Sequence, residues 1–107
     1  MSLLSAPLVA GDLRGAIYTF QVAGDVLPVH VHGPFDAHIT IVARGRVRVE
    51  NGVMKDGSFL IEETIDLGAG RCIDTEPGVY HQFIATTDDT RIFNIIRTIE
   101  RGAGTAR

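Results

Sequence analysis

The four histidines are the residues of this chain whose type and spacing point to chemistry. His30 and His32 are separated by one residue, and in a β-strand such a pair points to one face, about 6.5 Å apart along the chain. Two imidazoles placed in this way can converge on one metal ion at about 2.0–2.1 Å from each nitrogen. Taken alone, the pair is explained better by two solvent-facing histidines, or by two histidines bonded to the backbone.

The other two histidines strengthen the metal hypothesis, because each stands near a Gly/Pro turn at the start of a predicted strand. Gly33-Pro34 lies in the short segment between His32 and His38, and Pro77-Gly78 precedes His81. Imidazole ligands suit zinc, iron, nickel and copper, whereas manganese prefers more oxygen. The pattern predicts one divalent transition metal, and it leaves iron, zinc, nickel, manganese and copper open.

Two stretches around these histidines resemble the two short motifs of the cupin superfamily. The first motif usually reads Gly, five residues, His-X-His, three or four residues, Glu, six residues, Gly, and its slots hold Gly24, His30-Val31-His32, His38 and Gly45. The second usually reads Gly, five residues, Pro-X-Gly, two residues, His, three residues, Asn, and its slots hold Gly70, Glu76-Pro77-Gly78, His81 and Ala85.

The resemblance implies an all-β, antiparallel double-sheet jelly-roll barrel with a metal site inside it on His30, His32, His38 and His81. This chain departs from the pattern at three places. His38 replaces the usual glutamate after a slightly longer loop, Glu76 stands where the motif has proline, and Ala85 replaces the final asparagine. Four neutral imidazoles would leave the bound ion its full positive charge.

One alternative ligand remains open. If the loop before His38 bulges, Asp36 could supply a carboxylate instead. His38 is favoured for two reasons. Its spacing to Gly45 matches the motif, and in a strand that begins at His38 we expect alternation to place Asp36 outside the hairpin. In a third interpretation, His38 is a pocket residue that forms hydrogen bonds without coordinating.

Several further residues have possible roles. Cavity lining is possible for Phe35, Thr40, Phe83 and Asn94, although each is explained equally well as core or strand surface. Cys72 is predicted to be a buried, inert thiol, because no basic partner is near it in sequence. A solvated edge is the prediction for Arg44, Arg46 and Arg48. No general base is evident, and the weak candidates are Asp36, Glu76 and Tyr80.

Strands are predicted almost throughout, because glycine and proline interrupt the chain about every ten residues and no window has a helical apolar period. The predicted strands cover residues 13–22, 26–32, 38–43, 46–50, 58–67, 71–75, 80–86 and 91–99. Asn51-Gly52 and Asp56-Gly57 are predicted hairpin turns. Residues 1–11 are predicted to be an N-terminal extension, 12–100 the barrel and 101–107 a flexible tail.

Composition and charge limit the classes of partner that this protein is expected to bind. The chain of 107 residues is one domain with 45% hydrophobic and 21% charged residues. A net charge of −3 argues against nucleic-acid binding. No apolar stretch reaches the roughly 20 residues that span a bilayer, and no signal peptide is evident. The lone cysteine fits a cytoplasmic protein, and the exposed edges of a small barrel predict a homodimer.

The function predicted from these features is metal-dependent chemistry on a small, oxygen-rich molecule such as a keto acid, diketone or sugar acid. The metal would act as a Lewis acid on a carbonyl or carboxylate, or bind dioxygen, so oxygenase, isomerase and lyase reactions are all open. The alternative is a non-catalytic cupin module that binds or senses a small ligand. A closed, purely structural metal site is the least favoured hypothesis.

Overall fold

Two antiparallel sheets form the molecule, which is known from a computed structural model that describes residues 3–33 and 36–98. One sheet has the strand order β1-β2-β9-β4-β7, with bounds Leu3–Ala10, Leu13–Phe20, Thr90–Thr98, Asp36–Arg44 and Cys72–Thr75. The other has the order β3-β8-β5-β6, with bounds Val26–His30, Tyr80–Ala85, Arg46–Lys55 and Ser58–Gly68. The predicted antiparallel double-sheet architecture is confirmed.

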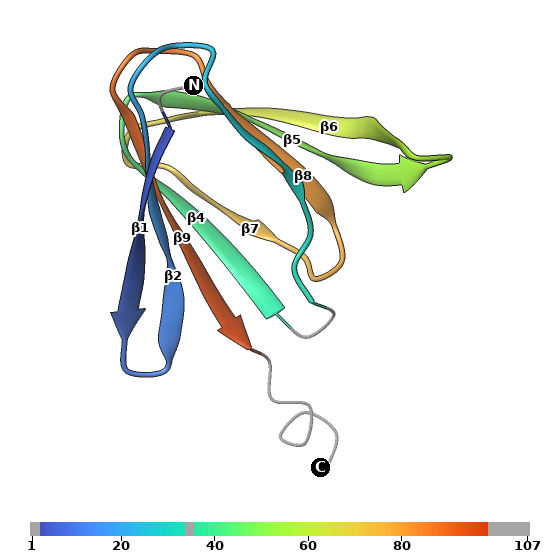
Figure 1. The fold of residues 1–107 in the computed structure, drawn as a ribbon, viewed down its shortest axis with the longest axis horizontal. Coiled ribbons are helices and arrows are strands. Elements are labelled where there is room, and N and C mark those ends of the chain that lie inside the picture. The colour runs from blue at the N-terminus through green and yellow to red at the C-terminus, as the bar shows by residue number, and fades with distance from the viewer. Residues whose placement is uncertain (1–2, 34–35, 99–107) are drawn as a thin grey trace.

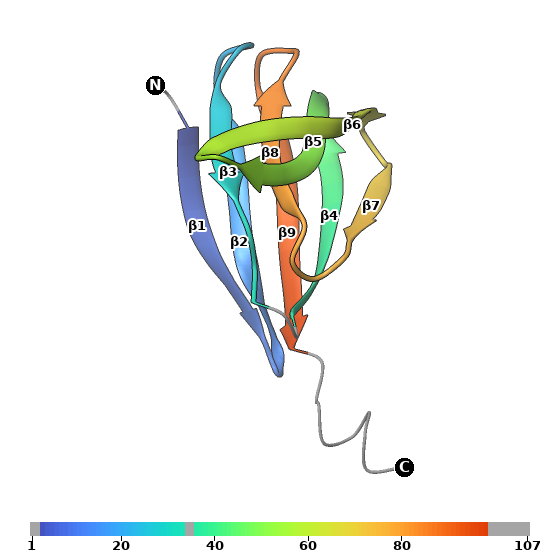
Figure 2. The same ribbon diagram turned by 90° about the vertical axis from the view of Figure 1, so that its right-hand side faces the viewer.

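The two sheets lie close together at the end that holds the β2–β3 and β8–β9 connections and diverge towards the other end (Figures 1 and 2). The described residues include no helix that is long and apolar enough to span a membrane. The β5–β6 hairpin extends beyond the rest of its sheet, as Figure 1 shows.

The inward faces of the strands change from apolar to polar along the barrel. Alternate residues of four strands point inward and are buried, and each series begins apolar and ends polar. The series are Val42, Thr40 and His38 on β4; Ala85, Phe83 and His81 on β8; Val47, Val49 and Asn51 on β5; and Ile92 and Asn94 on β9. The strand registers align the polar ends, so the histidines gather at one end of a continuous apolar core.

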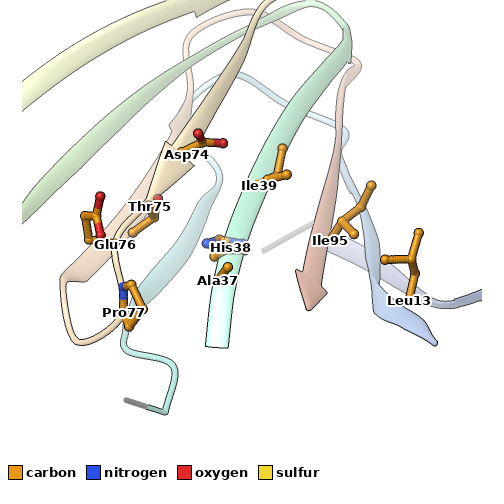
Figure 3. A pocket seen from close by; sticks show the side chains of 9 residues that line it. All are labelled: Leu13, Ala37, His38, Ile39, Asp74, Thr75, Glu76, Pro77 and Ile95. Atoms are coloured by element: carbon orange, nitrogen blue, oxygen red, sulfur yellow. The ribbon is translucent and has the colours of Figure 1, made fainter. Parts of the chain in front are cut away.

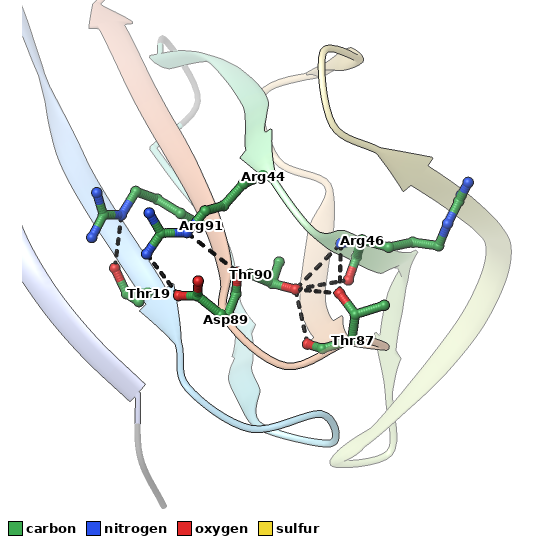
Figure 4. A network of polar contacts seen from close by, with 7 residues as sticks. All are labelled: Thr19, Arg44, Arg46, Thr87, Asp89, Thr90 and Arg91. Atoms are coloured by element: carbon green, nitrogen blue, oxygen red, sulfur yellow. Dashed lines mark hydrogen bonds and ion pairs between the residues drawn. The ribbon is translucent and has the colours of Figure 1, made fainter.

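The opposite, closed end is fastened by a polar network centred on the buried Thr90 (Figure 4). The Thr90 hydroxyl accepts a hydrogen bond from the amide of Arg46 at 3.2 Å and donates to the carbonyl oxygen of Thr87 at 2.9 Å. Arg44 forms an ion pair with Asp89, with 2.6 Å between Nη2 and Oδ1. These contacts join the start of β5, the end of β4 and the β8–β9 turn, and so fix where the two sheets meet.

Several predicted boundaries differ from the structure: the strand predicted over residues 26–32 ends at His30, and two other differences are larger. Residues 3–10 of the predicted N-terminal extension form β1, which pairs along its whole length with β2 at the edge of the larger sheet. The predicted turn at Asn51-Gly52 is wrong, because β5 continues through it to Lys55 with a register shift between the two residues. The turn lies at Asp56-Gly57, where both residues have positive φ. The flexible tail lies outside the described residues.

Close approach of two strands requires the glycine at position 52. A Cβ atom there would collide with the carbonyl oxygen of Leu60 on β6. At Gly68, on the same strand pair, an added Cβ would meet only the end of the flexible Arg46 side chain. We therefore expect Gly52→Ala to lower the free energy of unfolding by roughly 1–3 kcal/mol, the usual cost of overpacking.

Urea denaturation measures this loss, and Gly68→Ala is the matched control. The control should stay within about 0.5 kcal/mol of the parent. Equal stability of the two variants would contradict the close approach at Gly52.

Candidate metal centre

His30 and His81 face each other across two paired strands. His30 ends β3, His81 is the second residue of β8, and the two are direct partners in the antiparallel register. Their ring centroids are 4.2 Å apart. Cross-strand pairing thus brings together two imidazoles that are 51 residues apart in the sequence.

Both of these rings are held by the same local hydrogen bond. Nδ1 of His30 lies 2.8 Å from the carbonyl oxygen of Pro28, and Nδ1 of His81 lies 2.9 Å from that of Val79. A carbonyl oxygen can only accept, so each Nδ1 carries the proton and donates it. The proton-free Nε2 of each neutral ring is then the available metal ligand, the arrangement that orients histidines in metal sites.

His32 completes a group of three. It follows β3, and its ring centroid is 5.1 Å from that of His30 and 5.3 Å from that of His81. One ligand nitrogen from each of the three lies within 4.8 Å of the others. Of the residues that the structure describes, this is the group of histidine, cysteine or acidic side chains close enough to hold a metal ion.

His38 approaches the group from the other sheet. It lies on β4, is 1% exposed, and its ring centroid is 4.4 Å from that of His32 and 4.9 Å from that of His81. The structure therefore brings all four predicted histidines together between the sheets. His38 is not part of the tightest group of three, and its coordination stays a prediction.

Buried nitrogen atoms without partners show that these residues fit a metal ion. Nε2 of His32, Nε2 of His81 and both ring nitrogens of His38 are buried and have no hydrogen-bond partner among the described residues. A buried polar atom left unpaired costs about 1–3 kcal/mol, so such atoms are rare and seldom occur together. A cation bound between the rings would use these lone pairs.

Burial favours the uncharged imidazole at His32, His38 and His81 by lowering their pKa values. It lowers the pKa of His38 to about 3, with further lowering from His32, His81 and His30, while the side chain of Asn94 acts in the opposite direction. Burial also lowers the pKa of His81 to about 4, although the hydrogen bond to Val79 opposes it. The pKa of His32 is lowered by burial and then by His30. Neutral imidazole is the form that binds metal.

Asp36 lies nearer to the site than the sequence predicted. β4 begins at Asp36, two residues before His38, so both side chains leave the same face of the strand. The negative charge of Asp36 raises the pKa of His32, against the effect of burial. The argument that alternation puts Asp36 outside is therefore wrong, because it assumed a strand that starts at His38.

The residues predicted to line a cavity, and the cysteine, lie at different positions in the structure. Thr40 donates to Oδ1 of Asn94 at 2.8 Å in the buried interior beside His38, and Phe83 packs below the rings of His38 and His81. Phe35 lies outside the described residues. Cys72 is exposed, so the prediction of a buried thiol is wrong.

Arg44, Arg46 and Arg48, which were predicted to form a solvated edge, have partly exposed side chains. Each pairs with its own carboxylate: Arg44 with Asp89, Arg46 with Asp66 and Arg48 with Glu50.

Sequence reasoning missed two buried residues beside the histidines. Asn51 is the register partner of His81, and Thr75 is the register partner of His38. Asn51 was missed because the sequence pattern assigned it to a turn. Had β5 been extended by one inward position after Val49, alternation would have placed Asn51 inside.

A cavity of about 340 Å³ opens beside His38 (Figure 3). Its buried lining residues are His38 and Thr75, and much of the rest is apolar, including Leu13, Ile39 and Ile95. Asp74 and Glu76, on either side of Thr75, add two carboxylates. In the strand registers Ile39 and Ile95 lie on the face of the larger sheet opposite to His38, so the cavity opens mostly on the outside of that sheet.

Solved structures share this architecture. KdgF from Halomonas sp. matches with a TM-score of 0.70 at 19% identity, over 94% of this chain and 83% of its own. The Cupin_2 domain of an XRE family transcriptional regulator from Enterobacter cloacae matches with 0.71 at 11%, over 94% and 100%. A predicted oxalate decarboxylase from Thermotoga maritima matches with 0.70 at 16%, over 91% and 81%.

The chain is thus a small double-sheet barrel with a histidine cluster between its sheets. Its fold is that of the cupin superfamily, as the sequence resemblance predicted. No family model matches the sequence, and no curated protein does.

The lowered pKa values predict how acid affects the metal-free protein. Between about pH 6.5, where histidine titrates in the unfolded chain, and the folded values of about 4 for His81 and 3 for His38, the unfolded state binds more protons. The free energy of unfolding should therefore fall as the pH falls through this window, by up to about 1.4 kcal/mol per pH unit for each histidine.

Urea denaturation in the presence of a chelator at pH 5.0–6.5, above most carboxylate titrations, tests this. Replacing His38 by glutamine removes one titrating group, so the pH dependence should become shallower. An unchanged slope in the His38→Gln variant would contradict the neutral, buried state of His38.

Proposed function

We propose that this protein binds one divalent transition metal on His30, His32, His38 and His81 and acts as a metal-dependent enzyme on a small, oxygen-rich molecule. The cluster of buried, unpartnered ring nitrogens is the observation that supports this most directly. Bound there, the metal would polarise a carbonyl or carboxylate oxygen or bind dioxygen, which leaves oxygenase, isomerase and lyase reactions open.

The chain's own groups have separate tasks in this proposal. The backbone carbonyls of Pro28 and Val79 orient the rings of His30 and His81. The buried side chains of Thr40, Phe83 and Asn94 lie beside the histidines on the inner side of the cluster. Among the three candidate bases, Asp36 has the strongest support, because its charge acts on the ring of His32.

A non-catalytic binding or sensing module is the second candidate. It is favoured by the fold match to the cupin domain of a transcriptional regulator, which covers the whole of that domain. Turnover of a panel of carbonyl compounds by the protein loaded with iron, nickel or zinc separates the two candidates. Tight binding without turnover would favour the module.

We also propose that the chain forms a homodimer through the outer face of its larger sheet. Strand register puts Leu4, Ile17, Ile39, Ile41, Phe93 and Ile95 on that face. Leu4 is 54% exposed and Ile39 40%. A contiguous apolar face of this kind is typical of an interaction surface, and β1 also leaves one strand edge open for pairing.

Metal titration tests the ligand set. Chelator-treated protein should bind one metal ion per chain by calorimetry and elemental analysis. His32→Ala should abolish stoichiometric binding, because it removes the ligand between the other rings. His38→Glu should preserve binding and shift preference towards harder ions such as manganese.

The matched control is Val31→Ala, between two ligands but 38% exposed, which should bind as the parent does. The Asp36→Ala variant decides the fourth ligand. If it loses binding while His38→Ala does not, the carboxylate completes the site and the four-histidine assignment is wrong.

Sedimentation tests the dimer. The parent should sediment as a dimer at micromolar concentration, and Ile39→Glu should sediment as a monomer because a charge would be buried at the interface. Val22→Glu is the control, since Val22 is 52% exposed and lies in the β2–β3 connection. A monomeric parent would refute the dimer, and dissociation by Leu60→Glu alone would move the interface to the β5–β6 hairpin.

A further inference from the structure

A second pocket, of about 230 Å³, lies between the edge strands of the two sheets. β6 contributes Glu62 and Glu63 to its lining, and β7 with the residue after it contributes Asp74 and Glu76. Four acidic side chains therefore surround one small space. Figure 3 shows Asp74 and Thr75 at the end of β7 and Glu76 just after it, and these three residues line both pockets.

These four carboxylates are not neutralised by the protein. Within residues 3–33 and 36–98, none of them forms an ion pair, whereas the carboxylates of Asp66, Asp89 and Glu50 each pair with an arginine. The formal net charge of the whole chain is −3, which is smaller than the charge of the pocket alone. Four of the 13 acidic residues of the chain thus line one pocket whose described residues include no arginine or lysine.

Two buried oxygen atoms in the same pocket lack partners. Asn51 is 9% exposed and Thr75 5%, and neither Oδ1 of Asn51 nor Oγ1 of Thr75 has a hydrogen-bond partner among the described residues. The amide nitrogen of Asn51 already donates to Oε1 of Glu63 at 3.3 Å. The unused groups can therefore accept hydrogen bonds from a donor that enters the pocket.

The pocket adjoins the histidine cluster. Asn51 is the register partner of His81, and Thr75 is the register partner of His38. A molecule with donors bound at these two oxygens would contact the register partners of two of the histidines. The pocket is therefore placed to hold one end of a ligand whose other end reaches the cluster.

An organic cation fits this pocket better than a bare metal ion. Ca²⁺ and Mg²⁺ need several oxygens at about 2.0–2.6 Å from one centre. In the described part of the chain, no three acidic side chains bring their oxygens within 4.8 Å of one another, and the histidines are the group that meets this condition. Carboxylates spread around a space of this size instead suit the several N–H donors of an ammonium group.

We propose that the pocket between β6 and β7 binds the ammonium group of a small amine, so that the ligands of this protein are amines rather than free acids. The proposal rests on the proposed function only in assigning the other end of the amine to the histidine cluster. It narrows the substrate class, because a free carboxylate placed near Glu63 and Glu76 would be repelled.

Three probes of equal chain length and different charge test the proposal: butylammonium, butyrate and 1-butanol. Nuclear magnetic resonance titration of the metal-free protein should show butylammonium shifting the side-chain amide signal of Asn51 and the backbone signal of Thr75. Butyrate and butanol should leave both signals unchanged. Shifts of equal size with butyrate, or no shift with butylammonium, would overturn the proposal.

Isosteric variants locate the binding. Glu62→Gln with Glu63→Gln, and separately Thr75→Val, should weaken butylammonium binding by about tenfold, the loss expected for one charge-assisted hydrogen bond. Asp12→Asn, in the β1–β2 turn, removes a charge elsewhere and should leave binding unchanged. Equal weakening by Asp12→Asn would mean that net charge rather than this pocket attracts the amine, and the proposal would fail.

Two further measurements separate this proposal from the metal site. His32→Ala should still bind butylammonium in the absence of metal, so a failure of the metal function leaves the pocket testable. If the parent binds metal but no amine, only the pocket proposal fails. If Ca²⁺ alone produces the same shifts at lower concentration than butylammonium, the site is for an inorganic cation and the proposal is wrong.

Discussion

The site depends on two hydrogen bonds that imidazole rings donate to the nearby backbone. Nδ1 of His30 and Nδ1 of His81 each donate to the carbonyl oxygen two residues earlier in the chain. This fixes the tautomer and the ring plane before any ligand arrives, and it directs both Nε2 atoms into the space between the sheets. Together with His81, the rings of His32 and His38 keep unpaired nitrogen atoms in the interior, an arrangement that is costly unless another group occupies the space.

The barrel tolerates this cost because its stability comes from elsewhere. The apolar core, with Phe20, Val42, Val49, Phe83 and Ile92 fully buried, lies towards the closed end, and the polar network around Thr90 fastens that end. The polar inward positions lie at the other end of the same strands. The inward-facing side chains of the same strands therefore form the apolar core near the closed end and the histidine site near the other end.

Much of the site could be predicted from the sequence because it depends on local rules. The spacing of His30 and His32 predicted that the two rings lie together, which they do although β3 ends at His30. The resemblance adds His38 and His81 to them. The predictions failed where pairing with a neighbouring strand decides whether a residue lies in a strand or in a turn. Asn51-Gly52 has the composition of a turn, but β6 passes so close that Gly52 is needed inside a continuous strand. Asp36 was misplaced because the start of β4 depends on pairing with β9.

Pairing with a neighbouring strand also explains why residues 3–10 form β1. Residues 3–10 contain Pro7, which cannot donate to a ladder, and nothing in their pattern marks a strand. They form one because β2 offers a partner and because an edge strand tolerates proline. Sequence patterns describe what a segment prefers, whereas edge strands and bulges are decided by what lies beside them.

The projecting β5–β6 hairpin has a consequence for motion. From Val53 to Leu60 most of its side chains are exposed, in contrast to the buried Val47 and Val49 at the other end of β5. Its outer backbone hydrogen bonds should therefore open at lower free energy, and exchange their amide protons sooner, than those beside the core. Because Asn51 and Glu63 lie at the base of this hairpin, each bending of it moves one wall of the acidic pocket while β7 stays on the other sheet.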